Sequence, residues 1–260
     1  MERKIIEGKE VLFSEYKLKE NSKLWDFLGS ASFKKFLKKL EDSVLVVVWG
    51  DGTMLEAIAS EWKRNLPFLW VNYGHKWFLL NDVSILEGKT LFEKRLYPLL
   101  ECKLGSKKRV ALNEFDIKGW DGKMLDLDVS VTPWHMLNVV WDGLIISTPT
   151  GSTWYNSSLW WPILPHGLNT FVITPKAPWK PRGLAPIILK NNEEVTIVAK
   201  WRVTPVEIYS DGREFLKVTE KNLELKIRQS SKKVTLLISK KHLSYWDDKV
   251  LEEQWFTLKR

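Results

Sequence analysis

The first third of the chain alternates between amphipathic and wholly apolar stretches. Apolar residues recur at helical spacing over 23–40 with lysines between them, which predicts an amphipathic helix. The uninterrupted apolar run over 43–48 predicts a strand buried on both faces, as found in the middle of a parallel sheet. Helix formers follow over 54–61, and a second short strand is predicted over 67–72. We therefore expect a Rossmann-like α/β domain with a parallel sheet over residues 1–105.

Beyond residue 105 the pattern changes to short extended runs that turn residues separate. Such a series predicts a mostly-β second domain over 106–241. A last helical stretch begins near residue 244, and we expect the segment 242–260 to pack back on the first domain. The predicted strands cover 109–117, 123–131, 144–147, 170–174, 194–198, 206–209, 223–227 and 234–238.

Composition narrows the class of protein. The 260 residues are 44% hydrophobic, which supplies a full core, and no apolar run reaches the roughly 18 residues of a membrane span. The first residues lack the apolar stretch of a signal peptide, so we expect a cytoplasmic protein without a membrane partner. Cys102 is the single cysteine, which rules out an internal disulfide and argues against a structural zinc site.

The net charge of +8 favours anionic partners such as nucleotides, polyphosphate, nucleic acid or phospholipid. Basic clusters at 34–35, 38–39, 107–109 and 240–241 carry no nucleic-acid fingerprint. We interpret them as solvated faces and expect no nucleic-acid partner. The four histidines lack the spacing of zinc ligands, and no metal ligand is assigned.

A glycine-rich tetrapeptide, Gly50-Asp51-Gly52-Thr53, stands between the first predicted β-strand and the helix that follows it. Free backbone N–H groups and the helix dipole favour phosphate at such a position, and glycines allow close approach. The carboxylate between the glycines repels phosphate unless it accepts a proton or binds magnesium, which makes its presence informative. Taken alone, the tetrapeptide is equally compatible with a simple Asp-Gly turn.

Further motifs accompany this loop in a fixed order along the chain. They are Asp51-Gly52-Thr53, Asn72-Tyr73-Gly74, Ala111-Leu112-Asn113-Glu114, the stretch 142–153, Pro162-Ile163 and Ser210-Asp211-Gly212-Arg213. Together they resemble the NAD kinase family over residues 43–215, and the hexapeptide Thr-Pro-Thr-Gly-Ser-Thr over 148–153 is the most specific of them.

The resemblance implies an ATP-dependent kinase that phosphorylates the 2′-hydroxyl of the adenosine ribose of NAD, giving NADP. It implies an N-terminal α/β domain and a C-terminal β domain with NAD between them, Mg²⁺ accompanying ATP, and a homodimer or homotetramer. Asp51 is then the general base that takes the proton of the ribose hydroxyl as that oxygen attacks the γ-phosphate. Residues 4–13 either supply the first strand of the family in altered form, or that strand is missing.

The resemblance also assigns residues that bind NAD and nucleotide. Asn113 and Glu114 match the pair that holds NAD, and an amide beside a carboxylate suits ribose hydroxyls. Phe78 corresponds to an aromatic residue that packs near the adenosine, and Tyr155 is placed to stack on a base. The other candidates offer glycine backbone, hydroxyl or charged groups: Gly50, Gly52, Thr53, Asp142, Thr150, Gly151, Ser152, Thr153, Ser157, Ser158 and Arg213.

Six tryptophans occupy positions where the family has glycine, in a chain with 15 tryptophans and 14 glycines. Glycine at loop positions supplies positive φ or room for a ligand, and an indole there costs of order 1–3 kcal/mol or fills the pocket. We hypothesise that these codons are UGA, which some bacteria read as glycine; UGG codons would contradict this. The positions are Trp49, Trp70, Trp77, Trp141, Trp160 and Trp161.

Two other functions share features of this sequence. Lipid kinases of the diacylglycerol type carry a similar Gly-Asp-Gly-Thr loop, but a lipid substrate does not require the Asn113–Glu114 pair or the loop over 148–153. If the tryptophans are genuine, Trp49, Trp160 and Trp161 obstruct the ligand, and the chain is a catalytically impaired nucleotide-binding protein. The sequence leaves open whether ATP or polyphosphate is the donor, and whether NAD or NADH is preferred.

Overall fold

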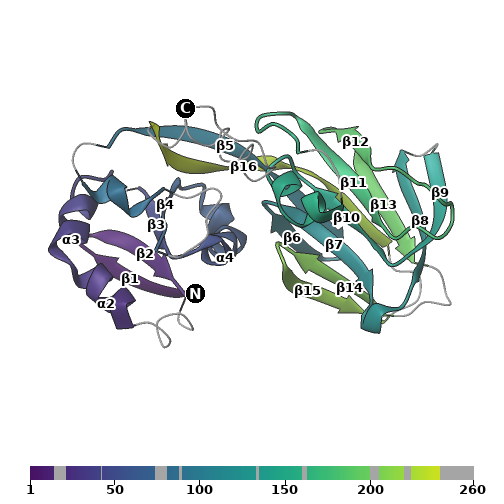
Figure 1. The fold of residues 1–260 in the computed structure, drawn as a ribbon, viewed down its shortest axis with the longest axis horizontal. Coiled ribbons are helices and arrows are strands. Elements are labelled where there is room, and N and C mark those ends of the chain that lie inside the picture. The colour runs from purple at the N-terminus through teal and green to yellow at the C-terminus, as the bar shows by residue number, and fades with distance from the viewer. Residues whose placement is uncertain are drawn as a thin grey trace, which may run out of the picture. The chain divides into compact units, whose positions relative to one another are not determined.

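The fold is seen in a computed structural model, in which the chain forms two units (Figure 1). One unit comprises Met1–Leu96 and the chain from Val234 onward, and the other comprises Tyr97–Lys233. Within the described residues, no helix is long and apolar enough to cross a membrane. The structure describes residues 1–14, 22–41, 43–73, 81–87, 90–132, 135–159, 163–199, 205–219 and 224–240.

The first unit is built on a sheet that is parallel except at its edge. β1 (Glu2–Ile6) and β2 (Lys9–Phe13) form an antiparallel hairpin, and β2 runs parallel to β3 (Leu45–Val48). β3 pairs in parallel with β4 (Phe68–Val71), and β4 pairs in parallel with the end of β16 (Glu224–Ser239). The prediction of a parallel α/β sheet is therefore confirmed, and β2 provides the first parallel strand.

Helices lie on both sides of this sheet. α2 (Ser22–Gly29) and α3 (Ala31–Leu37) are on one side of the β1–β4 strands, and α4 (Asp51–Glu61) is on the other (Figure 1). Apolar side chains of α2 and α3 share a core with alternate residues of β3, because successive side chains of a strand point to opposite faces. The shared core includes Leu24, Leu28, Phe33, Phe36, Val46 and Val48.

The single helix predicted over 23–40 is wrong, because the chain breaks at Ser30. This residue has an extended backbone, with φ −65° and ψ 147°, and its hydroxyl accepts a hydrogen bond from the Phe33 N–H at 3.2 Å. A serine in this position caps a new helix and satisfies one of the amides that its first turn leaves free. Helical spacing alone does not reveal such a break, since the apolar face continues through it.

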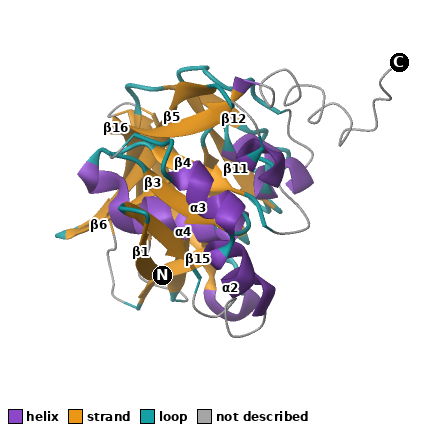
Figure 2. Ribbon diagram, turned by 90° about the vertical axis from the view of Figure 1, so that its left-hand side faces the viewer, coloured by secondary structure: helices purple, strands orange, loops and turns teal. Residues whose placement is uncertain are grey.

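The second unit is a sandwich of antiparallel strands, and strands dominate the described chain as a whole (Figure 2). One sheet has the order β12-β11-β10-β7-β14-β15, and in the other β16, β13, β8 and β9 are neighbours. β5 and β16 each continue from one unit into the other. The strands of this unit not yet bounded are β5 (Phe92–Leu104), β6 (Lys107–Ala111), β7 (Glu114–Gly119), β8 (Leu125–Thr132), β9 (His135–Trp141), β10 (Gly143–Ser147), β11 (Thr170–Lys176), β12 (Ile187–Lys190), β13 (Glu194–Ala199), β14 (Val206–Ser210) and β15 (Arg213–Val218).

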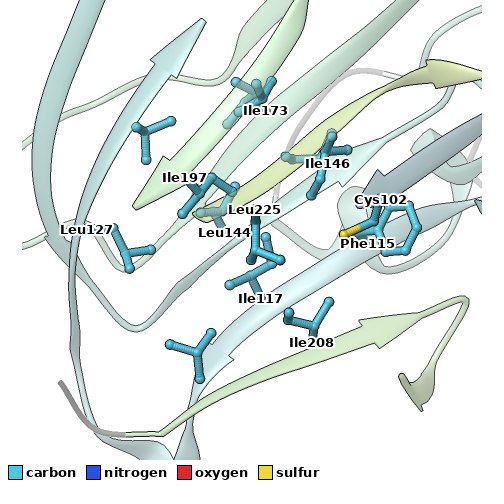
Figure 3. Close-up of a cluster of buried hydrophobic side chains, with 14 of the residues drawn as sticks. Cys102, Phe115, Ile117, Leu127, Leu144, Ile146, Ile173, Ile197, Ile208 and Leu225 are labelled. Carbon is cyan, nitrogen blue, oxygen red and sulfur yellow. The ribbon is translucent and has the colours of Figure 1, made fainter. Parts of the chain in front are cut away.

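Buried side chains from both sheets meet in one core (Figure 3). Ile117, Ile146 and Ile173 come from the six-stranded sheet, and Leu127 and Ile197 come from the facing strands. Cys102 belongs to the same core, and burial raises the pKa of its thiol to about 12. The cysteine is therefore a core residue, held in its unreactive thiol form.

Strand boundaries differ from the sequence prediction in three respects. The strand predicted over 109–117 is two strands, since β6 ends at Ala111 and β7 begins at Glu114. The strands predicted over 223–227 and 234–238 are the single long β16. Beyond residue 90, the strands β5, β9, β12 and β15 were missed. The helix predicted from residue 54 begins at Asp51. Short 3-10 turns occupy Trp62–Arg64, Val83–Leu86, Trp120–Gly122, Gly151–Thr153 and Tyr155–Leu159.

Candidate functional site

In the first unit, the candidate base lies where a buried strand becomes a helix. β3 ends at Val48, Gly50 is the N-cap of α4, and Asp51 is the first helical residue. Among the described residues no side chain caps this end, and the helix dipole favours negative charge there. Apart from its chain neighbours, no atom of the described residues lies within 4 Å of the position that a Cβ of Gly50 would occupy, which leaves open space beside Gly50.

Asp51 itself is half-buried, Gly52 is exposed and Thr53 is buried. The predicted loop 50–53 is thus the first turn of a helix, and its Gly50 carbonyl accepts a hydrogen bond from the Thr53 N–H at 3.0 Å. A carboxylate at this place has two chemical uses, because it accepts a proton or binds a cation while the neighbouring amides bind phosphate.

In the second unit, Asn113 and Glu114 lie at the interruption between β6 and β7. Both residues are buried, with exposed fractions of 2% and 6%. The Asn113 Oδ1 and Glu114 Oε2 atoms are enclosed and have no hydrogen-bond partner in the part of the chain that the structure describes. Buried polar atoms are almost always paired, so two orphan acceptors side by side indicate a ligand that supplies the missing donors.

The environment of Glu114 favours its protonated form. Burial raises the pKa of this carboxyl well above its usual value, and the negative charges of Asp211 and Asp116 raise the pKa further. A protonated carboxyl offers one O–H donor besides its acceptor oxygen. Glu114 is therefore suited to a ligand group that both donates and accepts, as a ribose hydroxyl does.

The turn that follows β10 is packed against the Asn113–Glu114 segment. The Thr148 N–H donates to the Asn113 carbonyl at 2.9 Å, and the Thr148 hydroxyl donates to the Leu112 carbonyl at 2.6 Å. A Cβ on Gly151 would stand 2.2 Å from the Asn113 carbonyl oxygen, so any larger residue would force the two segments to shift. The structure thus brings Asn113, Glu114 and the 148–151 turn together.

The Thr150 hydroxyl lies 3.4 Å from the His166 Nδ1, and the other hydroxyls that follow Thr148 donate to nearby carbonyls. Ser152 is fully buried; its Oγ donates to the Pro149 carbonyl at 2.6 Å and accepts from the Leu164 N–H at 2.9 Å, so it shapes the turn. Tyr155 is 46% exposed, and the Lys176 ammonium lies 5.4 Å from its ring centroid. The other hydroxyl donors are Thr153 to the Thr150 carbonyl at 3.0 Å, Ser157 to the Trp154 carbonyl at 2.7 Å and Ser158 to the Tyr155 carbonyl at 2.6 Å.

One predicted residue lies away from this group, one lies beside it and one lies outside the described residues. Asp142 is exposed immediately before β10, whereas Glu114 pairs with Ser147 at the far end of that strand, about 16 Å away at the usual rise per residue. Arg213 begins β15, next to the turn that carries Asp211. Phe78 lies outside the described residues.

Two polar groups of this site hold the 112–114 backbone, a part that the sequence did not assign to them. Thr148 holds the two carbonyls named above, and the Asp211 carboxylate accepts hydrogen bonds from the amides of residues 112–114. Both belong to quoted motifs, but in sequence an Asp-Gly pair is simply a turn signal. Only the fold brings the Asp211–Gly212 turn to the Asn113–Glu114 segment.

Three of the six unusual tryptophans fall within the described residues. Trp49 has φ 127°, in the region that favours glycine, and its indole packs against Tyr73 with ring centroids 5.8 Å apart. Trp70 and Trp141 are 2% and 1% exposed, and the Trp141 Nε1 has no hydrogen-bond partner in the described structure. Positive φ and a buried unpaired donor are both unfavourable for tryptophan. Trp77, Trp160 and Trp161 lie outside the described residues.

The described residues include no cluster of three or more His, Cys, Asp or Glu side chains arranged to hold a metal ion. A magnesium ion that arrives with a nucleotide needs only one or two protein carboxylates, because phosphate oxygens and water complete its shell. Asp51, which follows Gly50 at a helix N-terminus, fits that smaller requirement.

A helix N-terminus that suits phosphate and a pair of buried polar side chains that suit ribose are features of nucleotide-binding proteins. Solved structures share the fold: an NAD kinase from Archaeoglobus fulgidus in complex with ATP gives a TM-score of 0.68 at 22% identity, covering 92% of this chain and 97% of that one. The yeast NADH kinase complexed with NADH gives 0.67 at 20% identity, covering 84% and 68%. The predicted fold class is confirmed.

Sequence relatives identify the family within that class. The ATP-NAD kinase C-terminal domain model matches residues 112–239. The NAD kinase of Finegoldia magna is 30% identical over 192 residues, which are 66% of this chain and 70% of that protein. The NAD kinase of Neisseria gonorrhoeae is 32% identical over 190 residues, which are 67% of this chain and 63%, slightly under two thirds, of that relative. The chain belongs to the NAD kinase family.

Proposed function

We propose that this protein is an NAD kinase, which transfers the γ-phosphoryl group of ATP to the 2′-hydroxyl of the adenosine ribose of NAD. Membership of the family supports the reaction. The observation that carries the proposal for this chain is the pair of enclosed, unpartnered acceptors, Asn113 Oδ1 and Glu114 Oε2. Such a pair requires a ligand with hydroxyl or amide donors, and a nucleoside with free ribose hydroxyls provides them.

Asp51 is the proposed general base. Its carboxylate takes the proton of the ribose 2′-hydroxyl while that oxygen forms a bond to the γ-phosphorus and the bond from phosphorus to the β,γ-bridging oxygen of ATP breaks. Phosphoryl transfer depends mainly on positioning and charge stabilisation. The start of α4, with Gly50, Gly52 and Thr53, is proposed to contact the phosphates.

The second unit is proposed to hold the nucleosides. Asn113 and Glu114 bind ribose hydroxyls, and Tyr155 stacks on a base. The remaining proposed contacts with NAD or ATP are Phe78, Asp142, Thr150, Gly151, Ser152, Thr153, Ser157, Ser158 and Arg213. Hydrogen bonds inside the turn indicate that Ser152 acts by shaping it rather than by touching the substrate.

Mg²⁺ or another divalent cation is proposed to enter with ATP, where it neutralises phosphate charge. A cytoplasmic location and a homodimer or homotetramer complete the proposal. NAD and ATP are the proposed ligands, with no nucleic-acid or membrane partner.

The test is formation of NADP from NAD, ATP and Mg²⁺ by the purified full chain. Asp51→Asn removes the proton acceptor and should lower kcat by about 10²- to 10⁴-fold while NAD still binds. Asp26→Asn, which changes an exposed aspartate of α2, is the matched control and should keep full activity.

Three outcomes would contradict the proposal. Phosphorylation of diacylglycerol in lipid vesicles without turnover of NAD would favour the lipid kinase. Binding of NAD without turnover would favour an impaired nucleotide-binding protein. Equal activity of Asp51→Asn and Asp26→Asn would remove Asp51 from the mechanism.

A further inference from the structure

A second aspartate of the quoted motifs, Asp211, makes more hydrogen bonds at the proposed NAD site than any role as a turn residue requires. It lies between β14 and β15, where Asp211 and Gly212 have φ of 50° and 74° and form a two-residue hairpin turn. Asparagine or glycine would also suit this backbone. The turn alone therefore does not explain a carboxylate.

The Asp211 side chain points toward three consecutive amides that precede and begin the neighbouring strand β7. Oδ2 accepts from the Leu112 N–H at 3.0 Å, and Oδ1 accepts from the Asn113 and Glu114 N–H groups at 2.7 Å and 3.2 Å. The Asp211 N–H in turn donates to the Glu114 carbonyl at 3.0 Å. Asp211 thus binds the three amides of this segment through its carboxylate and the Glu114 carbonyl through its own amide.

These amides need a partner because they lie in the interruption between β6 and β7. Leu112 and Asn113 are outside both strands and buried, and buried amides without a partner are strongly unfavourable. On the carbonyl side, Thr148 occupies the Leu112 and Asn113 oxygens. The backbone of the segment is therefore held on its amide edge by Asp211 and on its carbonyl edge by Thr148.

The side chains of Asn113 and Glu114 have no comparable support of their own. Asn113 Oδ1 and Glu114 Oε2 have no hydrogen-bond partner in the described structure. The position of the backbone therefore decides where these two atoms point. We propose that Asp211 is a positioning residue for NAD: its carboxylate fixes the 112–114 backbone so that Asn113 and Glu114 meet the ribose hydroxyls. This inference rests on the proposed function.

The charged groups around Asp211 make this arrangement sensitive to pH. Burial raises the pKa of Asp211 to about 6, against the opposing effect of the three amide donors and of the Arg109 guanidinium on β6. Glu114 and Asp116 on β7 are its acidic neighbours, and Arg213 follows it on β15. Protonation places a hydrogen on one oxygen, and that oxygen then accepts poorly. Affinity for NAD should therefore fall as the pH drops through about 6.

The experiment compares Asp211→Asn with Asp121→Asn in the full chain. An asparagine has one acceptor oxygen for three amides and turns an NH₂ group toward the others. Asp121 is the matched control, because it is an exposed aspartate in an Asp-Gly turn of the same unit, with φ 56° followed by Gly122 at 69°. Dissociation constants for NAD are measured by calorimetry from pH 5 to 8, with KM for NAD and ATP and kcat.

We expect Asp211→Asn to raise the dissociation constant and the KM for NAD about ten- to a hundredfold, because the variant loses a charged hydrogen bond. The KM for ATP and kcat should change much less. The fall in NAD affinity near pH 6 should disappear in this variant and persist in Asp121→Asn. Equal NAD affinities of the two variants at pH 7.5 would overturn the inference.

A second measurement does not depend on NAD or on the variant folding to full yield. Burial raises the pKa of Asp211, so the closed segment binds a proton more tightly than the opened one. Amide exchange in the wild-type chain should therefore slow at residues 112–114 between pH 7 and pH 5 relative to neighbouring β7 amides, after correction for the intrinsic rate. Unchanged protection would overturn the inference even if the Asp211→Asn chain fails to fold. A folded wild-type chain that does not bind NAD, with the pH-dependent protection present, would instead overturn the proposed function.

Discussion

Trp49 is the residue at which sequence and backbone disagree most directly. Its φ of 127° is compatible with glycine and strained for any residue with a Cβ. The position also follows a buried strand and precedes the N-cap of α4, so the strain lies next to the proposed base. A glycine here would relieve it, as the hypothesis of UGA codons requires.

Comparison of Trp49→Gly with Trp49→Ala isolates this backbone effect, because both changes remove the indole and its contact with Tyr73. We expect the glycine variant to have the larger free energy of unfolding by about 1–3 kcal/mol, measured by urea denaturation. Equal stability of the two variants would show that the backbone is unstrained. Sequencing the six codons tests the decoding hypothesis itself.

Glu114 should make stability depend on pH in an unusual direction. Its pKa is raised in the folded state, so the folded chain holds the proton to a higher pH than the unfolded chain does. The free energy of unfolding contributed by this group is therefore greatest below the unfolded pKa of about 4.3 and is lost as the pH rises.

Urea denaturation at intervals from pH 5 to 8 measures this contribution. The wild-type chain should lose stability over this range, and Glu114→Gln should lose less of it. Glu214→Gln, which changes an exposed glutamate of β15, is the control and should follow the wild-type curve. Parallel curves for all three chains would contradict the assignment of the effect to Glu114.

At the scale of elements, the close packing of the 148–151 turn against the β6–β7 interruption assembles the proposed NAD-binding residues. Gly151→Ala places a methyl group 2.2 Å from the Asn113 carbonyl oxygen, and this contact forces the two segments apart. We expect a loss of stability of about 1–3 kcal/mol, seen as a lower Tm, together with weaker NAD binding. Gly29→Ala, where no atom lies within 4 Å of the new Cβ, should change neither by much. A similar Tm for both variants would show that the turn shifts to accommodate the methyl group without a loss of stability.

The elements themselves were predicted with uneven success, for identifiable physical reasons. β3 and β4 were found because strands buried on both faces consist of apolar residues throughout. The 23–40 stretch was misjudged because Ser30 interrupts the helix without interrupting its apolar face. β5 was missed because charged residues occupy its first part, where its burial is uneven.

At the scale of the molecule, Cys102 reports on the core of the second unit. It is fully buried, which keeps reagents away from the thiol. Burial also raises its pKa to about 12, so the thiol stays protonated and unreactive. We expect reaction with a thiol reagent at pH 8 to be negligible in the folded chain and to follow unfolding in urea. Rapid labelling of the folded chain would show that this core opens readily.

The sequence by itself determined the α/β and mostly-β classes, the parallel arrangement of the first sheet and the family, because these follow from local apolar patterns and contiguous motifs. It also singled out Asp51, Asn113 and Glu114 through motif identity. Only the tertiary structure decided that Asp211 and Thr148 hold the 112–114 backbone, since residues about 100 and 35 positions away meet there through sheet pairing. It also decided that Trp49 has a backbone suited to glycine. Hydrogen bonds between distant segments produce no periodic pattern in the sequence, so their partners can be identified only when the pairing of the strands is known.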